Sequence, residues 1–297
     1  MGWSARQWLA MTPETTYGVY NTTGTQMWVR LTDNNAFTVR PKPLVATIRS
    51  ADGGNRRRQR VSSREAVSGT LNTLFYPSQA PAMLSWGVNL NNYTLQSYTI
   101  DHFDSVRVRR YLGCLVKTMT IGCAAAKNDG IATLSFEILG QQPASPDPTL
   151  AEPLPTAFPT ESPYTHQQSA GLVSIGGTRT KYRSIELKVK NLLIPTWDET
   201  TFPSAIYWGG RDVDWSVSVQ YVSTIDRANF ESQTPLPCSI GWSQQTPAHS
   251  ASFNFAATNF IGSLTDDLPL DGAGYETLLM QTFYDNTAAT DLILTAT

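Results

Sequence analysis

The sequence predicts an all-β protein, a β-sandwich or barrel with short flanking helices, arranged as two tandem β units. Three observations support this fold class: strict apolar–polar alternation in the longest segments, few helical segments, and a low content of charge. Only 15% of the 297 residues are charged, against roughly 25% in an average soluble domain, while 10% are aromatic. This composition is typical of a β-rich protein that places much of its surface against other protein.

The first unit is expected over residues 1–142 and consists mainly of strands. Residues 112–141 are expected to form two strands around Asn128-Asp129-Gly130, because an Asp-Gly pair tolerates the positive φ of a tight hairpin turn. A strand over residues 66–76 runs directly into a short helix expected over residues 78–87.

Residues 143–163 are expected to link the two units. This segment holds seven of the chain's 18 prolines. Proline lacks a backbone N–H and fixes φ, so neither a helix nor a central strand can run through the segment. The second unit is therefore expected over residues 164–297.

The second unit shows the clearest alternation. Ile185, Leu187 and Val189 alternate with charged residues and are expected to face a core. The same pattern in residues 212–221 puts five apolar side chains on one face: Val213, Trp215, Val217, Val219 and Tyr221. A short helix is expected over residues 223–232, and two strands close the unit within residues 278–296.

The order of strand, short helix and terminal strand pair thus occurs twice. The two expected helices begin at residues 78 and 223, which are 145 positions apart. We interpret this order as a diverged duplication, because the arrangement of elements repeats although the residues do not.

Side chains for catalysis or for binding a metal or cofactor do not occur in any recognised pattern. The sequence has no nucleophile-elbow, zinc-protease, P-loop or dinucleotide-binding motif. His102, flanked by Asp101 and Asp104, is expected at an exposed strand end or turn. The three cysteines lack the spacing of zinc ligands and are expected to be buried free thiols: Cys114, Cys123 and Cys238. We therefore expect no enzymatic activity, no metal and no cofactor.

The densest positive charge lies in a long loop expected at about residues 49–66. It carries five arginines: Arg56, Arg57, Arg58, Arg60 and Arg64. Such a run can bind nucleic acid, contact another protein copy or remain solvated. The net charge of −2 argues against a dedicated nucleic-acid-binding protein, which is more often basic overall.

Membrane insertion and secretion are not expected. No stretch approaches 18 apolar residues, and the start of the sequence lacks the apolar core of a signal peptide.

Several segments follow one another in a distinctive order. They are PETTYGVYN near the start, the strand and helix VSGTLNTLFYPSQAPAML, the paired strands YTIDHFDSVRVRRYLGCLVKTMTI and DGIATLSFEILGQ, and the closing QTFYDNTAATDLIL. The first long strand contains a Gly113-Cys114 step. In this order the segments resemble the tail tube proteins (major tail proteins) of long-tailed, siphophage-like bacteriophages, in the branch with a duplicated tube fold. The resemblance covers most of the chain, but residues 143–180 match no motif.

The resemblance implies a structural virion protein without catalysis. In this family, strands of neighbouring subunits join into one barrel around a channel, and rings stack into the tail tube that conducts DNA into the host. It implies self-association, with a trimeric pseudo-hexamer favoured over a hexamer. It also implies contacts with the tape measure protein and the tail terminator or distal tail proteins, and location in the virion tail after synthesis in the host cytoplasm.

A channel that conducts DNA should not hold it, and many arginines in its wall would bind phosphate tightly. We therefore interpret Arg56, Arg57, Arg58, Arg60 and Arg64 as a contact with an adjacent ring or subunit, where arginine can pair with carboxylates. Two alternative functions remain open. One is another virion structural protein, for capsid decoration or tail completion; the other is a nucleic-acid-binding β-domain that uses this loop.

Overall fold

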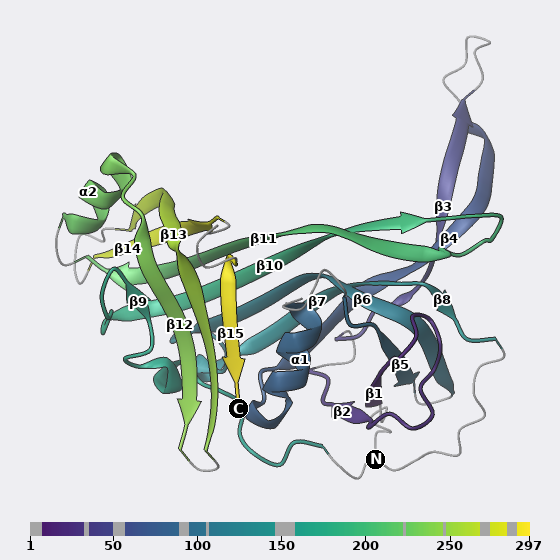
Figure 1. Ribbon diagram of the computed structural model, residues 1–297, viewed down its shortest axis with the longest axis horizontal. Helices are drawn as coiled ribbons and strands as arrows, with labels where there is room; N and C mark the ends of the chain where they lie inside the picture. The colour runs from purple at the N-terminus through teal and green to yellow at the C-terminus, as the bar shows by residue number, and fades with distance from the viewer. Residues whose placement is uncertain are drawn as a thin grey trace.

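The protein is a mostly β structure built around one extended antiparallel sheet (Figure 1). The computed structural model describes residues 8–32, 36–49, 57–88, 95–104, 107–145, 158–221, 224–245, 248–267, 274–283 and 290–297. Of residues 43–49, 57–63, 256–258 and 266–267 it describes the backbone alone. The predicted all-β fold class is confirmed. Both described α-helices are short, as expected.

The first half of the chain contributes eight of the described strands and one α-helix. In chain order these are β1 (Trp8–Pro13), β2 (Met27–Val29), β3 (Arg40–Arg49), β4 (Arg57–Leu74), α1 (Ala80–Gly87), β5 (Tyr98–Phe103), β6 (Val108–Ala124), β7 (Thr133–Gly140) and β8 (Gln142–Pro143). Within the sheet the main strands lie in the order β3-β4-β7-β6-β5-β1.

The second half contributes seven described strands and one α-helix. These are β9 (Ser174–Ile175), β10 (Tyr182–Thr196), β11 (Ala205–Gln220), α2 (Ile225–Ser232), β12 (Leu236–Gln244), β13 (His249–Asp267), β14 (Tyr275–Thr282) and β15 (Leu292–Ala296). Their order in the sheet is β10-β11-β14-β13-β12-β9. The pairing of β6 with β10 joins this set to the first.

Strand β6 has different neighbours along its length. Residues 108–114 pair with β5, and residues 118–124 pair on the same edge with β10. The opposite edge carries β8 and β7. Two irregularities accompany this change of neighbour: a positive φ of 64° at Gly113, near the end of the first stretch, and a bulge at Lys117, just before the second. The bends allow one strand to serve two differently oriented parts of the sheet.

The core lies between the apolar side of the sheet and helix α1, which Figure 1 shows packed beside it. Trp86 is buried and its indole N–H donates to the carbonyl of Cys114 at 3.2 Å. A Cβ on Gly87 would lie 2.2 Å from the sulfur of Met119, so a glycine is needed where the helix ends against β6.

Most of the predicted elements and faces are confirmed. The expected helices correspond to α1 and α2, and Ile185, Leu187 and Val189 are buried in β10. Asn128, Asp129 and Gly130 all have positive φ in the turn between β6 and β7. The predicted face of residues 212–221 is correct for the four residues within β11: Val213, Trp215, Val217 and Val219. Tyr221 was wrongly placed, because it lies beyond the end of β11 and is 41% exposed.

The arginine-rich segment is mainly strand. Residues 57–64 belong to β4 and pair with β3, so the loop expected at about residues 49–66 is much shorter. The sequence suggested a loop because the segment is polar, whereas the two strands form a hairpin arm that projects from the sheet (Figure 1).

The expected linker is only partly described, since residues 146–157 lie outside the described residues. Its end packs on the first half. The ring of Phe158 lies edge-on to that of Trp28, and the carboxylate of Glu161 accepts a hydrogen bond from the N–H of Ser78 at 3.1 Å.

His102 is buried in β5, contrary to the expected exposed strand end or turn. Its ring lies 4.6 Å from that of Phe37, and every residue of β5 is buried, because both sides of this strand are covered. Burial lowers the pKa of His102 to about 4, despite the opposing effect of the Asp104 carboxylate.

Acid is therefore expected to destabilise the subunit through His102. The native imidazole stays neutral while the unfolded one takes up a proton below about pH 6.5, so the free energy of unfolding falls between about pH 6.5 and pH 4. The decrease from this residue is about 3 kcal/mol. Urea denaturation of unassembled His102→Phe should lack this component, while the control His249→Gln should retain it. An identical pH dependence in His102→Phe and wild type would refute the assignment.

Candidate functional site

One face of the sheet is mainly polar over its central part, with Leu279 as an exposed apolar exception. Side chains on neighbouring strands hydrogen-bond across it: Thr118 Oγ1 donates to Glu137 at 2.9 Å, Ser135 to Asn72 at 2.6 Å, and Lys190 Nζ to Asp214 at 2.7 Å. The charged residues are of both signs and nearly balanced: Lys117, Lys188 and Lys190 against Glu137, Glu186, Asp212 and Asp214. The polar face is therefore suited to contact with water or a passing solute, with no dense positive charge.

Several strand edges have no partner among the described residues, and those of β3 and β13 are two of the longer ones. Strand β3 pairs with β4 on one edge only. Strand β13 pairs with β12 up to Asn259, and beyond that residue it pairs only with β14. Because unpaired edges tend to add another strand, both are candidate subunit interfaces.

Two hairpin arms, β3–β4 and β10–β11, project beyond the core and approach each other (Figure 1). The N–H of Glu65 in β4 donates to the carbonyl of Thr201 in the β10–β11 turn at 2.7 Å. The indole N–H of Trp197 donates to the carbonyl of Glu65 at 3.4 Å. The turn of the second arm is thus anchored on the first.

The five arginines predicted as a contact site do not form one described cluster. The guanidinium of Arg64 lies 5.5 Å from the ring centroid of Trp197, a cation–π contact within the same chain. Arg57, Arg58 and Arg60 belong to β4, whose side chains are not described there, and Arg56 lies outside the described residues.

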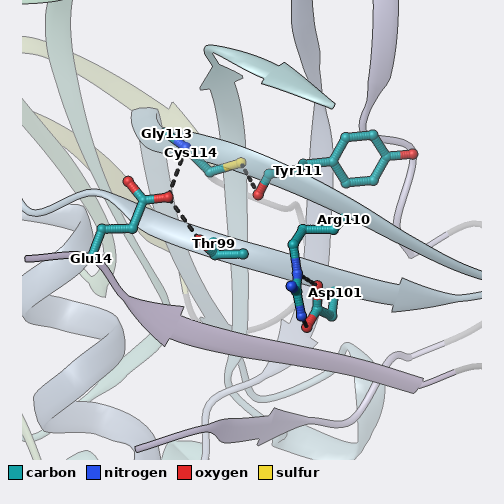
Figure 2. A network of polar contacts seen from close by, with 7 residues as sticks. All are labelled: Glu14, Thr99, Asp101, Arg110, Tyr111, Gly113 and Cys114. Atoms are coloured by element: carbon teal, nitrogen blue, oxygen red, sulfur yellow. Dashed lines mark hydrogen bonds and ion pairs between the residues drawn. The ribbon is translucent and has the colours of Figure 1, made fainter. Parts of the chain in front are cut away.

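A buried carboxylate near the N-terminus was not assigned a role from the sequence. Glu14 is 6% exposed and accepts hydrogen bonds from the N–H groups of Gly18 and Gly113, at 2.8 and 2.9 Å. It also accepts from the hydroxyls of Ser97 and Thr99, at 2.7 and 2.8 Å. Figure 2 shows this carboxylate beside β5 and the bend of β6. Four donors compensate for burying the charge, so Glu14 fixes the bend at Gly113.

A second contact fixes the same segment farther along. The guanidinium of Arg110 binds the Asp101 carboxylate through two hydrogen bonds of 2.7 and 2.8 Å (Figure 2). The same guanidinium lies 3.6 Å from the ring centroid of Tyr20. The PETTYGVYN segment and the Gly113-Cys114 step, far apart in sequence, are therefore in contact through Glu14.

The thiols show no arrangement for chemistry. All three cysteines are free and buried, as expected. Burial raises the pKa of Cys123 to about 11 and that of Cys238 to about 12, so both stay protonated at neutral pH. Within the described ranges no group of three His, Cys, Asp or Glu side chains could hold a metal ion. None of the helices in that part of the chain is long and apolar enough to cross a bilayer.

Replacement of Glu14 by Ala should leave four donors without their acceptor. We expect the free energy of unfolding to fall by about 3 kcal/mol, measured by urea denaturation of the unassembled subunit. The exposed neighbour Thr15 provides the control, since Thr15→Ala removes no buried contact. Equal stabilities of the two variants would contradict a structural role for Glu14.

Comparison with known proteins identifies the family of this chain. A search of curated proteins found no match. A protein-family model described as "Phage tail tube protein" matches residues 4–286. Because the match covers nearly the whole sequence, the chain belongs to the phage tail tube protein family.

Proposed function

We propose that this protein is the tube subunit of a long-tailed, siphophage-like phage and that its copies form rings, stacked around a channel that conducts DNA into the host. The observation that carries the proposal is the repeated strand order. The order β3-β4-β7-β6-β5-β1 matches β10-β11-β14-β13-β12-β9, with α1 and α2 at corresponding places in the chain. This match supports a duplicated tube fold with units at 1–142 and 164–297.

Irregularities within the strands also match. The register of β6 against β7 shifts between Val116 and Thr118, and that of β13 against β14 shifts between Ile261 and Ser263. These positions differ by the same number of residues: 261 − 116 = 145 and 263 − 118 = 145. Corresponding bulges in corresponding strands support common ancestry of the two units.

The pairing of β6 with β10 inside the chain indicates how strands of two neighbouring copies would pair. The first unit's β6 pairs through residues 118–124 with β10 of the second unit. The corresponding strand of the second unit is β13, and its corresponding stretch is the unpaired edge described above. The strand that corresponds to β10 is β3, which also has an open edge. Pairing β13 of one copy with β3 of the next therefore repeats a contact that the chain already makes.

The register of that contact follows from the pairing of β6 with β10. Lys188 of β10 lies opposite Thr120 of β6. Thr120 corresponds to Thr265, since 120 + 145 = 265. In the second unit, Lys188 pairs with Asp214 of β11, which pairs on its other side with β14. In the first unit, Arg40 pairs with Ser68 of β4, which pairs on its other side with β7. Arg40 of β3 therefore holds the place that Lys188 has in β10. Arg40 of one copy is therefore expected opposite Thr265 of the next.

Three copies of a two-unit chain give a ring with six units, so we favour a trimeric pseudo-hexamer over a hexamer. Closing the sheet around the ring removes the open edges and places one face of the sheet toward the channel. The polar face fits the channel, because its hydroxyls are well hydrated and its nearly balanced charge gives no tight phosphate binding. Passage of DNA needs no catalytic group. Further partners would be the tape measure protein and the tail terminator or distal tail proteins.

The arginines of the first arm take part in this assembly under the same proposal. Arg57, Arg58, Arg60 and Arg64 belong to a strand of the projecting arm, and Arg56 directly precedes them in the sequence. Guanidinium groups in this segment can pair with carboxylates of another copy. The basic arm is thus proposed as a contact between copies, in the virion tail and in assembly within the host cytoplasm.

A cysteine pair tests the ring and its register. Oxidised Arg40→Cys/Thr265→Cys should give covalent trimers on non-reducing gels, because the two positions meet only between copies. Each single variant serves as a control, and Arg40→Cys/Ser263→Cys, displaced by two residues, should crosslink more slowly. The native cysteines are buried and should not interfere. Absence of crosslinked species in assembled protein would refute this junction.

Replacing Arg56, Arg57 and Arg58 by Ser tests the basic arm. The subunit should still fold and form rings, but the tubes seen by electron microscopy should be shorter, since exposed ion pairs of about 0.2–1 kcal/mol each are lost in every copy. Tubes of normal length would refute the role of these arginines.

A further inference from the structure

The two ends of the long hairpin β10–β11 carry opposite charge. Its turn holds exposed Asp198 and Glu199, directly after the end of β10. At the other end of the same strand, Lys181 precedes β10, and Lys127 lies in the turn between β6 and β7. We propose that the acidic turn of one copy seats on this basic end of a copy in the next ring. The inference rests on the proposed tube.

The direction of the strands explains why these ends would meet. If β3 and β13 join copies around the ring, the sheet edges are used within the ring. The strands then run along the channel axis with the tilt of barrel strands, about 35–45°. Their opposite ends face the rings above and below. A head-to-tail stack therefore brings the turn at residues 198–199 toward the start of β10 in the next ring.

The basic end is an ordered part of the sheet. The N–H of Ala125 donates to the carbonyl of Arg183 at 2.8 Å, which holds the β6–β7 turn against the start of β10. The side chain of Arg183 donates to Ser218 at 2.9 Å and lies 4.8 Å from the ring centroid of Tyr275. Lys127 and Lys181 are exposed beside this held arginine. The positive charge therefore lies on a backbone segment that hydrogen bonds hold in place.

The acidic turn is also held in place before any assembly. Trp197 and Thr201, on either side of the two acidic residues, are both bonded to Glu65 of the first arm. The N–H of Ser204 donates to the carbonyl of Thr196 at 2.9 Å and closes the hairpin. A preorganised turn loses little conformational freedom on binding, which favours the contact.

The same arm carries an exposed apolar patch, made by Leu192, Ile194 and Tyr207. These side chains are 60%, 47% and 61% exposed. Ile194 lies directly opposite Tyr207, and Leu192 and Ile194 both reach over Gly209. A grouped apolar surface of this kind indicates burial against protein. Apolar contact from the patch would provide adhesion, while the charges set which end binds.

DNA in the channel is a poor occupant for this arm. Asp198 and Glu199 would repel phosphate, and an apolar patch offers it no hydrogen-bond donors. A second copy, by contrast, presents lysines at the position that the stack brings to the turn.

Charge exchange gives the decisive experiment. In a chain that also carries Arg40→Cys/Thr265→Cys, Asp198→Lys/Glu199→Lys should leave formation of the crosslinked trimer unchanged. In the otherwise native chain, the same exchange should lower the amount of sedimentable tube by about tenfold or more. Adding Lys127→Glu/Lys181→Glu to the same chain should restore tubes, because the attraction is re-established with reversed signs. The Lys127→Glu/Lys181→Glu change alone should block stacking. Asp129→Asn, which removes a negative charge beside Lys127 and suits the positive φ there, is the control and should not shorten the tubes.

The outcomes distinguish contacts within a ring from contacts between stacked rings. Normal tubes from Asp198→Lys/Glu199→Lys, or failure of the four-residue exchange to restore them, would overturn the inference. Loss of the trimer in Asp198→Lys/Glu199→Lys would also overturn it, by assigning the turn to the ring. The proposed ring itself is judged separately, by whether Arg40→Cys/Thr265→Cys crosslinks in an otherwise native chain.

Discussion

The pairing of β6 with β10 is the contact on which the rest of this structure depends. It joins two sets of strands into one sheet and satisfies the backbone groups of both strands along residues 118–124. Within the described residues the same need remains unmet at the outer edges of β3 and β13, the strands proposed to correspond to β10 and β6. The chain thus makes this contact once internally and leaves complementary edges on β3 and β13. These two edges are the geometric basis of the proposed ring.

The shape of β6 is maintained by buried polar groups rather than by apolar packing alone. Glu14 holds the bend at Gly113 through the backbone N–H of that residue. Asn191, 3% exposed in β10, donates to the carbonyls of Val116 in β6 and Gly87 at the end of α1, at 2.9 and 3.0 Å. Each of these side chains ties together segments that are distant in sequence. Such bonds specify one arrangement of the strands, because an incorrect register would leave buried groups unsatisfied.

Local pattern was sufficient for the strands β6, β7, β10 and β11 and for the two helices. Alternation identified the core residues of β10 and β11 because one side of each strand meets the core and the other stays polar. It failed where long-range contacts decide the environment. His102 looked exposed between two aspartates, yet every residue of β5 is buried and the His102 ring packs against that of Phe37. Glu14 was given no role from the sequence, and only the fold brings Ser97, Thr99 and Gly113 to it. The polar composition of residues 57–64 likewise concealed a strand that forms half of an arm.

The charge of the two arms indicates what a two-unit chain can do that six identical units cannot. The first arm carries an arginine run, whereas the turn of the second carries Asp198 and Glu199. Six copies of one unit would present the same charge at every arm, and so only one sign of charge to the next ring. In a ring of three two-unit chains the arms alternate in sign, and adjacent arms can touch, as Arg64 and Trp197 already do within the chain. Under the proposed duplication, the divergence of the two arms would therefore give each ring face a pattern of both charges for the next ring.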